Sequence, residues 1–143
     1  MPYPSAGGSF VVRVPQGWAQ SAAGSAVVFT DKFNSVRIES APRSQAPDVP
    51  SARAQEIPQL QSSVPGFQAG QVTMVQRSAG PAVLITYQAN SAPNAVTGKS
   101  VTEAVERYEF WRGGQEVVLT LSAPQGADNV DPWRMVTDSF RWQ

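Results

Sequence analysis

The chain has 143 residues, with eleven basic and eleven acidic side chains, no histidine and no cysteine. These absences exclude, within this chain, a Ser-His-Asp triad, a cysteine nucleophile, a disulfide and a zinc site built from imidazole or thiolate ligands. The balanced, scattered charges lack the basic stripe of a nucleic-acid-binding surface, so we expect no nucleic-acid partner. Carboxylate or lysine chemistry, oxygen-ligated metals and a role without catalysis stay open.

The length suits a single domain, residues 1–143, that buries a substantial core. We expect residues 1–8 to form a flexible N-terminal segment. They show neither the basic nor the apolar region of a secretory signal peptide. No apolar run in the chain has the roughly 20 residues that a membrane span needs.

Short alternating segments in the first part of the chain predict strands. Residues 9–14 place Phe10, Val12 and Val14 on one face and Val11 and Arg13 on the other, which indicates one strand, and a Pro-Gln-Gly turn follows. Residues 26–30 and 36–40 indicate an antiparallel hairpin.

A helix is predicted next. Residues 51–64 carry apolar side chains at helical spacing, with Ser51 as a possible N-cap. Pro58 interrupts this pattern, so the helix either kinks at that residue or begins there. Two strands and then a long polar loop follow, at residues 71–77, 82–89 and 90–99.

The segment 101–111 fits either a helix or a strand. Its apolar residues have helical spacing, but in its second half polar and apolar residues alternate as in a strand. We favour a strand over at least residues 106–112, because residues 116–122 are strongly β-like and Gly113 and Gly114 supply a tight turn. Apolar side chains on both faces of the second strand indicate a central strand that is covered on both sides.

The chain is expected to close with a helix. Asp131 fits the N-cap position and Pro132 the first turn. An apolar stripe that faces the core is predicted from Trp133, Val136 and Phe140.

Four stretches, in their order along the chain, carry a family resemblance. They are residues 10–18 (FVVRVPQGW), residues 28–31 with 35–38, the hairpin 107–121, and the closing helix 133–140. Their order resembles the Mog1/PsbP-like fold family. The resemblance implies an α+β fold, in which an antiparallel sheet of six to seven strands is flanked by helices as an α/β/α sandwich.

Within this family the chain looks more similar to bacterial envelope lipoproteins than to the photosystem protein of plants. The histidines associated with metal in the plant branch have no counterpart here. Scarce lysine beside abundant arginine, alanine and glycine indicates a GC-rich genome, and we expect an actinobacterial relative. The resemblance implies an extracytoplasmic location, with a signal peptide and a lipid-attachment cysteine upstream of Met1.

The function predicted from these observations is a non-catalytic extracytoplasmic module for binding or assembly, the soluble domain of a lipoprotein. It would bind a protein partner and touch the membrane only through a lipid anchor. Two alternatives stay open. One is a small-molecule-binding or hydrolytic pocket that uses carboxylates with Tyr87 or Tyr108. The other is a cytosolic adaptor, because some members of this fold are partners of small GTPases. The oligomeric state is not indicated.

Candidate binding residues lie at the hairpin tip and in the long polar loop. Trp111 and Arg112 flank the tip glycines and could form an exposed anchor of the kind enriched at interfaces. Packing against the core is the competing interpretation. Asn94 and Lys99 are the candidates in the polar loop.

A third candidate place is the corner before the closing helix. Asp128 and Asn129 are its binding candidates. Asp128 and Asp131 also offer oxygen ligands that suit calcium, although Asp131 has a competing role as a helix cap. No other cofactor or metal is expected.

Three glutamates on one segment could supply paired carboxylates for acid–base catalysis. On a strand, Glu103 and Glu109 face one way and Glu106 the other. The nearby Arg107 and Arg112 favour ordinary ion pairs instead.

Overall fold

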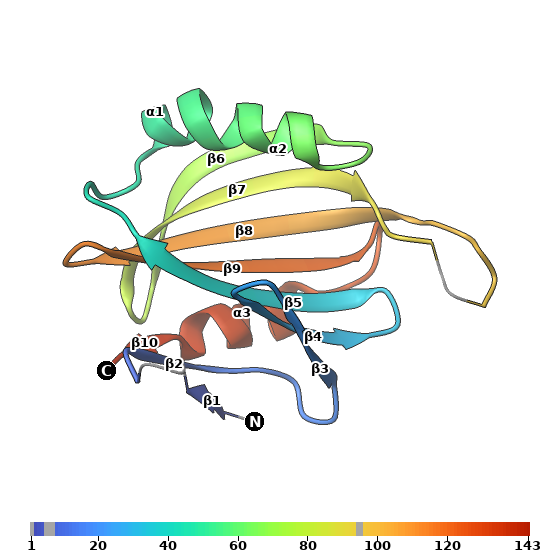
Figure 1. Ribbon diagram of the computed structural model, residues 1–143, viewed down its shortest axis with the longest axis horizontal. Coiled ribbons are helices and arrows are strands. Elements are labelled where there is room, and N and C mark those ends of the chain that lie inside the picture. Colours follow the sequence, from blue (N-terminus) through green and yellow to red (C-terminus); the bar gives the residue numbers. More distant parts are fainter. Residues whose placement is uncertain (1, 5–7, 94–95) are drawn as a thin grey trace.

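Two antiparallel sheets and two sets of helices build the fold (Figure 1). This computed structural model describes residues 2–4, 8–93 and 96–143. The larger sheet has seven strands in the order β3 (Ala19–Ala23), β4 (Ala26–Asp31), β5 (Asn34–Pro42), β9 (Gln115–Pro124), β8 (Thr102–Arg112), β7 (Gly80–Asn90) and β6 (Gln68–Arg77). The predicted α+β class, with an antiparallel sheet of six to seven strands flanked by helices, is confirmed.

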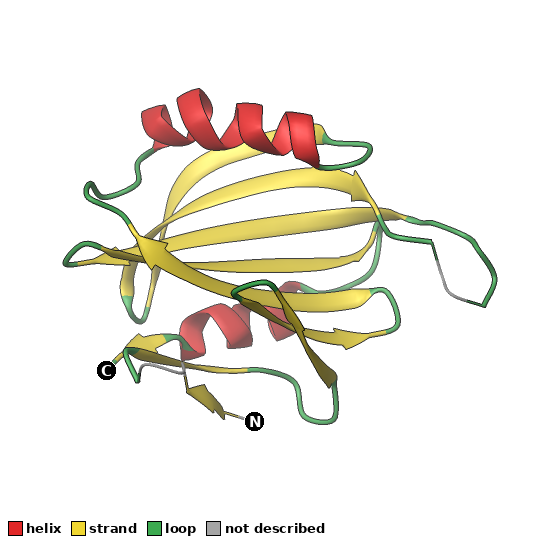
Figure 2. Cartoon of the chain, in the orientation of Figure 1, coloured by secondary structure: helices red, strands yellow, loops and turns green. Residues whose placement is uncertain are grey.

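Each face of the large sheet is covered by a different layer (Figure 2). Three consecutive helical segments lie on one face: α1 (Val49–Ser51), the π-helix η1 (Ala52–Glu56) and α2 (Ile57–Ser63). The other face carries α3 (Val130–Ser139) and a three-stranded sheet of β1 (Pro2–Pro4), β2 (Phe10–Arg13) and β10 (Arg141–Trp142). The arrangement forms three layers with the large sheet in the middle.

The β8–β9 hairpin occupies the centre of the large sheet. The predicted hairpin around Gly113 and Gly114 is confirmed. Its first strand, predicted over at least residues 106–112, begins already at Thr102. On the α3 side, Phe110 stacks on Phe140 with ring centroids 4.4 Å apart. On the other side, Val105 packs in a second apolar cluster beneath α2. The helix-like spacing of residues 101–111 therefore reflects a strand that is buried on both faces.

The predicted stripe on the closing helix is confirmed, since its three side chains lie in the core. They are Trp133, Val136 and Phe140. The predicted cap of this helix is wrong. Its N-cap residue is Asn129, and Asp131 lies within the first turn. A carboxylate in the first turn is still favourable, because it complements the positive end of the helix dipole.

The start of the first helix also differs from the prediction. The helix begins at Val49 with Asp48 as its N-cap, whereas the prediction had Ser51 in that role. The Asp48 side chain accepts from the Ser51 N–H, and the Ser51 hydroxyl accepts from the Asp48 N–H, which is a capping box. Pro58 lies in the first turn of α2, which begins at Ile57 and directly continues η1, so the helix does not begin at this proline but passes through it after a π-turn.

Three short strands were not predicted. β3 is made of small and polar residues without an apolar alternation, and β10 has only two residues, so neither gives a periodic signal. The third, β1, lies within residues 1–8, the segment that we expect to be flexible, and pairs with β2. The flexibility of that segment stays a prediction. No helix in the described part of the chain is long and apolar enough to cross a membrane.

Gly70 lies where β6 departs from regular pairing with β7, between Ala69 and Val72. A Cβ atom at this position would lie 2.5 Å from Oγ1 and 2.6 Å from the carbonyl oxygen of Thr86. We therefore expect Gly70→Ala to lower the free energy of unfolding by about 2 kcal/mol, because β6 must move away from β7. Urea denaturation measures this change. Ala69→Ser, at the exposed neighbouring position, is the control that should leave the midpoint unchanged, and an equal midpoint for both variants would contradict the prediction.

Candidate functional site

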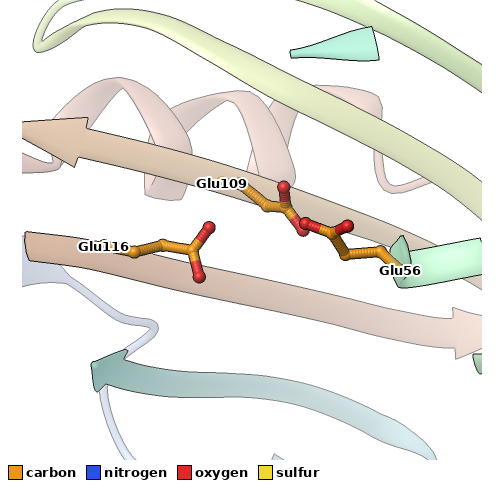
Figure 3. Close-up of side chains that lie close together, drawn as sticks. All are labelled: Glu56, Glu109 and Glu116. Atoms are coloured by element: carbon orange, nitrogen blue, oxygen red, sulfur yellow. The ribbon is translucent and has the colours of Figure 1, made fainter. Parts of the chain in front are cut away.

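Three carboxylates converge on the sheet face that α1, η1 and α2 cover (Figure 3). Glu109 comes from β8, Glu116 from β9 and Glu56 from the end of η1. One oxygen of each lies within 4.8 Å of the other two. Glu109 is 0% exposed and Glu56 is 5% exposed, so this group, here termed the carboxylate cluster, is buried at the heart of the protein.

Strand alternation places two members of the carboxylate cluster. Alternate residues of a strand point to the same side, so Glu109 shares its face with Arg107 and Trp111. The hairpin register pairs Trp111 with Glu116, which brings Glu116 to that same face, diagonal to Glu109. The two glutamates are therefore close in space although seven positions separate them in the chain.

The π-helix supplies the third member. Its wider turn closes with the Ile57 N–H donating to the carbonyl of Ala52, and Ala52 is fully buried against the sheet. Pro58 follows directly, and it lacks the N–H that an uninterrupted α-helix would need. We attribute the π-turn to this proline, since such turns relieve a break in the α-helical ladder. Glu56, at the end of the π-turn, faces the sheet.

Two arginines hold the carboxylate cluster. Arg43 Nη1 lies 2.7 Å from Glu56 Oε1 and 2.7 Å from Glu116 Oε2. Arg107 Nε donates to Glu109 Oε2 at 2.9 Å. The backbone of Arg43 is fixed as well, because its N–H donates to the Gly114 carbonyl and its own carbonyl accepts from Trp111 Nε1, both at 2.8 Å. The hairpin tip thus positions the central guanidinium.

The carboxylate cluster carries one negative charge more than its two arginines balance. Among the described residues, the buried side-chain oxygens left without a hydrogen-bond partner are Glu56 Oε2 and Glu109 Oε1, the latter 3.8 Å from Arg43 Nη1. Figure 3 shows the two carboxyl groups pointing toward each other. Burial raises the pKa of Glu109 to about 7, an effect that Arg107 opposes and that the charges of Glu56 and Glu116 reinforce. A proton on Glu109 neutralises the excess charge and lets this carboxyl donate toward Glu56.

A metal ion suits this group less well than a proton does. Calcium takes six to eight oxygen ligands. Here the Arg43 guanidinium already contacts Glu56 and Glu116 where a cation would lie. The residues paired with Glu109 on the adjoining strands, Val83 and Val118, offer only apolar side chains. The carboxylate cluster is therefore better described as an ion-pair network that ties the helices to the sheet and takes up a proton near neutral pH.

A second polar group lines a cleft of about 450 Å³ on the opposite face of the sheet, next to Trp133. Arg77 donates from Nε to Thr137 Oγ1 at 2.9 Å and from Nη2 to the Tyr108 hydroxyl at 3.1 Å. That hydroxyl donates to Glu106 Oε1 at 2.7 Å. Burial and the bond to Glu106 raise the pKa of Tyr108 to about 12, so the hydroxyl stays protonated. These groups mainly bind one another and join α3 to the sheet.

An apolar groove of about 420 Å³ runs along α3 on the side of β2. Its walls come from the turn after β2, including Pro15, and from the helix residues Pro132, Met135 and Val136. Met135 is 74% exposed, whereas Val130, which is 76% exposed, lines the cleft on the opposite side of α3. Met135 therefore presents an apolar side chain to solvent beside a hollow that other apolar groups could fill.

The structure separates the two candidates at the hairpin tip. Trp111 is half-buried and its indole N–H binds Arg43, so it serves the carboxylate cluster. Arg112 points to the other face, where its guanidinium carbon lies 5.7 Å from the centre of the Trp142 ring. Lys99 is exposed in the polar loop, and Asn94 lies outside the described residues.

The corner before α3 is the candidate place that adjoins the apolar groove. Asp128 is exposed, and the Asn129 amide donates to the Ala127 carbonyl at 3.3 Å. Asp131 is exposed and borders both the groove and the cleft on the opposite side of α3. A role of Asp128 and Asp131 in calcium binding stays a prediction.

Sequence reasoning did not find most of the carboxylate cluster. The sequence offers Glu109 only as one of three glutamates that could supply carboxylates for catalysis or form ordinary ion pairs, and Arg43, Glu56 and Glu116 are not among the predicted site residues. Only tertiary pairing brings these segments together. One signal was available: Glu109 lies between Tyr108 and Phe110 in a segment that pairs with a strand expected to be covered on both sides.

The proton on Glu109 predicts a pH-dependent stability. The pKa of Glu109 is about 7 in the folded protein against an ordinary 4.5, so the folded state binds more protons between these values. The free energy of unfolding therefore falls as pH rises from 4.5 to 7. Glu109→Gln keeps the shape and the donor without the charge. We expect the variant to be more stable than the wild type at pH 8, by about 2–3 kcal/mol.

Urea denaturation at pH 5 and at pH 8 measures this difference. Asp31→Asn, at the exposed end of β4, is the matched control and should follow the wild type at both pH values. If Glu109→Gln is less stable than the wild type at pH 8, the ionised Glu109 does not destabilise the fold, its pKa is not raised, and the proton assignment is wrong.

No known protein-family profile matches the chain, and no curated protein sequence matches it. Solved structures share its fold. The Ran-binding protein Mog1p of Saccharomyces cerevisiae is 13% identical with a TM-score of 0.61, and the match covers 99% of this chain and 94% of Mog1p. The chain also matches a longer Bacteroides thetaiotaomicron protein at 13% identity and a TM-score of 0.60, but spans only 48% of its length.

Two bacterial proteins are similar over nearly their whole length. The cyanobacterial PsbP (CyanoP) of Synechocystis is 12% identical with a TM-score of 0.65, and the match covers 100% of this chain and 92% of CyanoP. LpqN of Mycobacterium tuberculosis, involved in cell envelope biogenesis, is 14% identical with a TM-score of 0.54, covering 100% and 90%. At such identities the likeness concerns the fold. The chain has the Mog1/PsbP-like fold that its sequence predicted.

Proposed function

We propose that this chain is a module that binds a protein partner through the outer face of α3 and the corner before it. The observation that carries this proposal is the apolar groove with the exposed side chain of Met135 at its edge. A Met side chain is flexible and polarisable, and it adapts to the shape of an apolar partner. Exposed apolar side chains beside a groove are a mark of interaction sites.

The surroundings of the groove favour a folded protein as the occupant. Arg13 and Asp131 lie at its rim, so charges of both signs surround an apolar centre. Interfaces between proteins have this composition, with an apolar core and a polar rim. Arg134 and Asp138 add an exposed ion pair at 2.9 Å on the same helix. The partner we expect inserts an apolar side chain beside Met135 and meets the rim with polar groups.

The resemblance in fold supports binding as the activity. Mog1p binds Ran, and LpqN takes part in cell envelope biogenesis. Of these two settings we propose the cell envelope for this chain, as the soluble domain of a lipoprotein. This location rests on the resemblance to bacterial envelope proteins in sequence and on the likeness to LpqN.

A photocrosslinking amino acid in place of Met135 tests the binding surface. In cells of the source organism it should give one specific crosslinked protein, whereas the same group in place of Val96, which is 93% exposed in the distant polar loop, should not. With that partner purified, we expect Met135→Glu to weaken binding about ten-fold or more and Val96→Glu to leave it unchanged, because an apolar anchor at the centre of an interface carries much of its energy. A crosslink from position 96 alone would move the binding surface to the polar loop.

The location is tested separately, on the full gene. We expect a signal peptide and a lipid-attachment cysteine to be encoded upstream of Met1, and the protein to partition with the membrane fraction and to incorporate a labelled fatty acid. Recovery in the soluble cytosolic fraction without the label would favour the cytosolic adaptor instead. Binding at Met135 can hold in either case, so the two results are independent.

A further inference from the structure

The outer edge of β6 is an open edge of the large sheet. β6 is the last strand in the sheet order, and its other side pairs with β7. An unpaired edge offers a row of backbone N–H and C=O groups to another strand, and proteins usually protect it with charges, prolines or short length. The opposite edge, β3, has only five residues. β6 has ten and contains no proline.

Charge does not protect this edge either. Residues 68–76 carry no charged side chain, and Arg77 is the single charge of the strand. The Arg77 side chain is bound to Thr137 and Tyr108, which draws it onto the α3 face and away from the edge. Met74 is 48% exposed, so an apolar side chain accompanies the open backbone.

The bulge at Gly70 protects only the first part of the strand. From Val72 to Arg77, β6 pairs with β7 without a register shift. A two-residue turn joins Arg77 to Gly80, and the two residues that flank such a turn hydrogen-bond to each other through their backbones. The N–H and C=O of Arg77 therefore point toward β7. Hydrogen-bonded and non-hydrogen-bonded pairs alternate from there along the two strands, so Gln76 and Pro81 form a non-hydrogen-bonded pair, which suits a proline because it has no N–H. By the same alternation, the backbone groups of Val72, Met74 and Gln76 point away from β7, toward the open edge.

We propose that β6 pairs antiparallel with β6 of a second copy of this chain, about a two-fold axis at Met74. Two identical strands related by a two-fold axis pair antiparallel, and the residue on the axis lies opposite its own copy. The backbone groups of that residue must point toward the open edge so that the two copies can hydrogen-bond, and those of Met74 do. Val72 then lies opposite Gln76 of the other copy, and Met74 opposite itself. No charge meets a like charge in this register, and the chain has no net charge to oppose association.

A single cysteine tests the pairing directly. The chain has no cysteine, so a disulfide in Met74→Cys forms only between two copies. Residues on the axis have Cα atoms about 5.5 Å apart in such a pair, within the range that a disulfide spans. We expect Met74→Cys to give a covalent dimer under mild oxidation. Ser21→Cys, on the opposite edge strand, should stay monomeric under the same conditions.

Sedimentation equilibrium on the cysteine-free protein gives the second readout. We expect the wild type to dimerise with concentration and Met74→Lys to raise the dissociation constant several-fold, because two like charges would face each other across the axis. Val96→Lys adds the same charge elsewhere and should leave the constant unchanged. A wild type that stays monomeric over the accessible concentrations would overturn the proposal, and so would a dimer that Met74→Lys does not weaken.

Discussion

The guanidinium of Arg43 is the contact on which the arrangement of the layers depends. It joins Glu56 of the helical layer to Glu116 of the central hairpin, and the hairpin tip holds its backbone through Gly114 and Trp111. A buried ion pair stabilises a fold only when its remaining polar atoms are satisfied. Protonation of Glu109, whose pKa lies near 7, meets that condition, because the carboxyl can then donate toward Glu56 and the one unbalanced negative charge is removed. Register and protonation are therefore linked at the centre of the molecule.

The helices cover the carboxylate cluster, so we expect partners to bind at the outer surface of the protein and not on this face of the large sheet. Glu109 is fully buried, and the polar groups of the opposite cleft bind one another through Arg77 and Tyr108. Among the exposed apolar side chains of the described residues, Met135 of α3 and Met74 of β6 lie beside a groove and an open sheet edge. We therefore expect a substitution in the carboxylate cluster to act through stability and its dependence on pH, and a substitution at either exposed methionine to act on association and leave the core intact.

Local patterns in the sequence predicted the elements whose side chains alternate or repeat strongly. The hairpin at Gly113 and Gly114 and the stripe from Trp133 to Phe140 are of this kind. Tight turns and apolar periodicity are local physical signals, so they survive without knowledge of the fold. β3 has no such period, because it is an edge strand of small exposed residues. The convergence of Glu56, Glu109 and Glu116 depends on a π-turn and a cross-strand register, neither of which a linear pattern encodes.

The contacts of Arg77 connect the two proposed surfaces, the groove along α3 and the open edge of β6. A charged residue at the end of an edge strand normally discourages pairing with another chain. Here its guanidinium is committed to Thr137 of α3 and to the Tyr108 hydroxyl. The contact that anchors α3, and with it the apolar groove, is therefore the same contact that removes charge from the β6 edge. A partner on α3 and a second copy on β6 can bind together, since the groove opens toward β2 and the edge lies at the end of the large sheet.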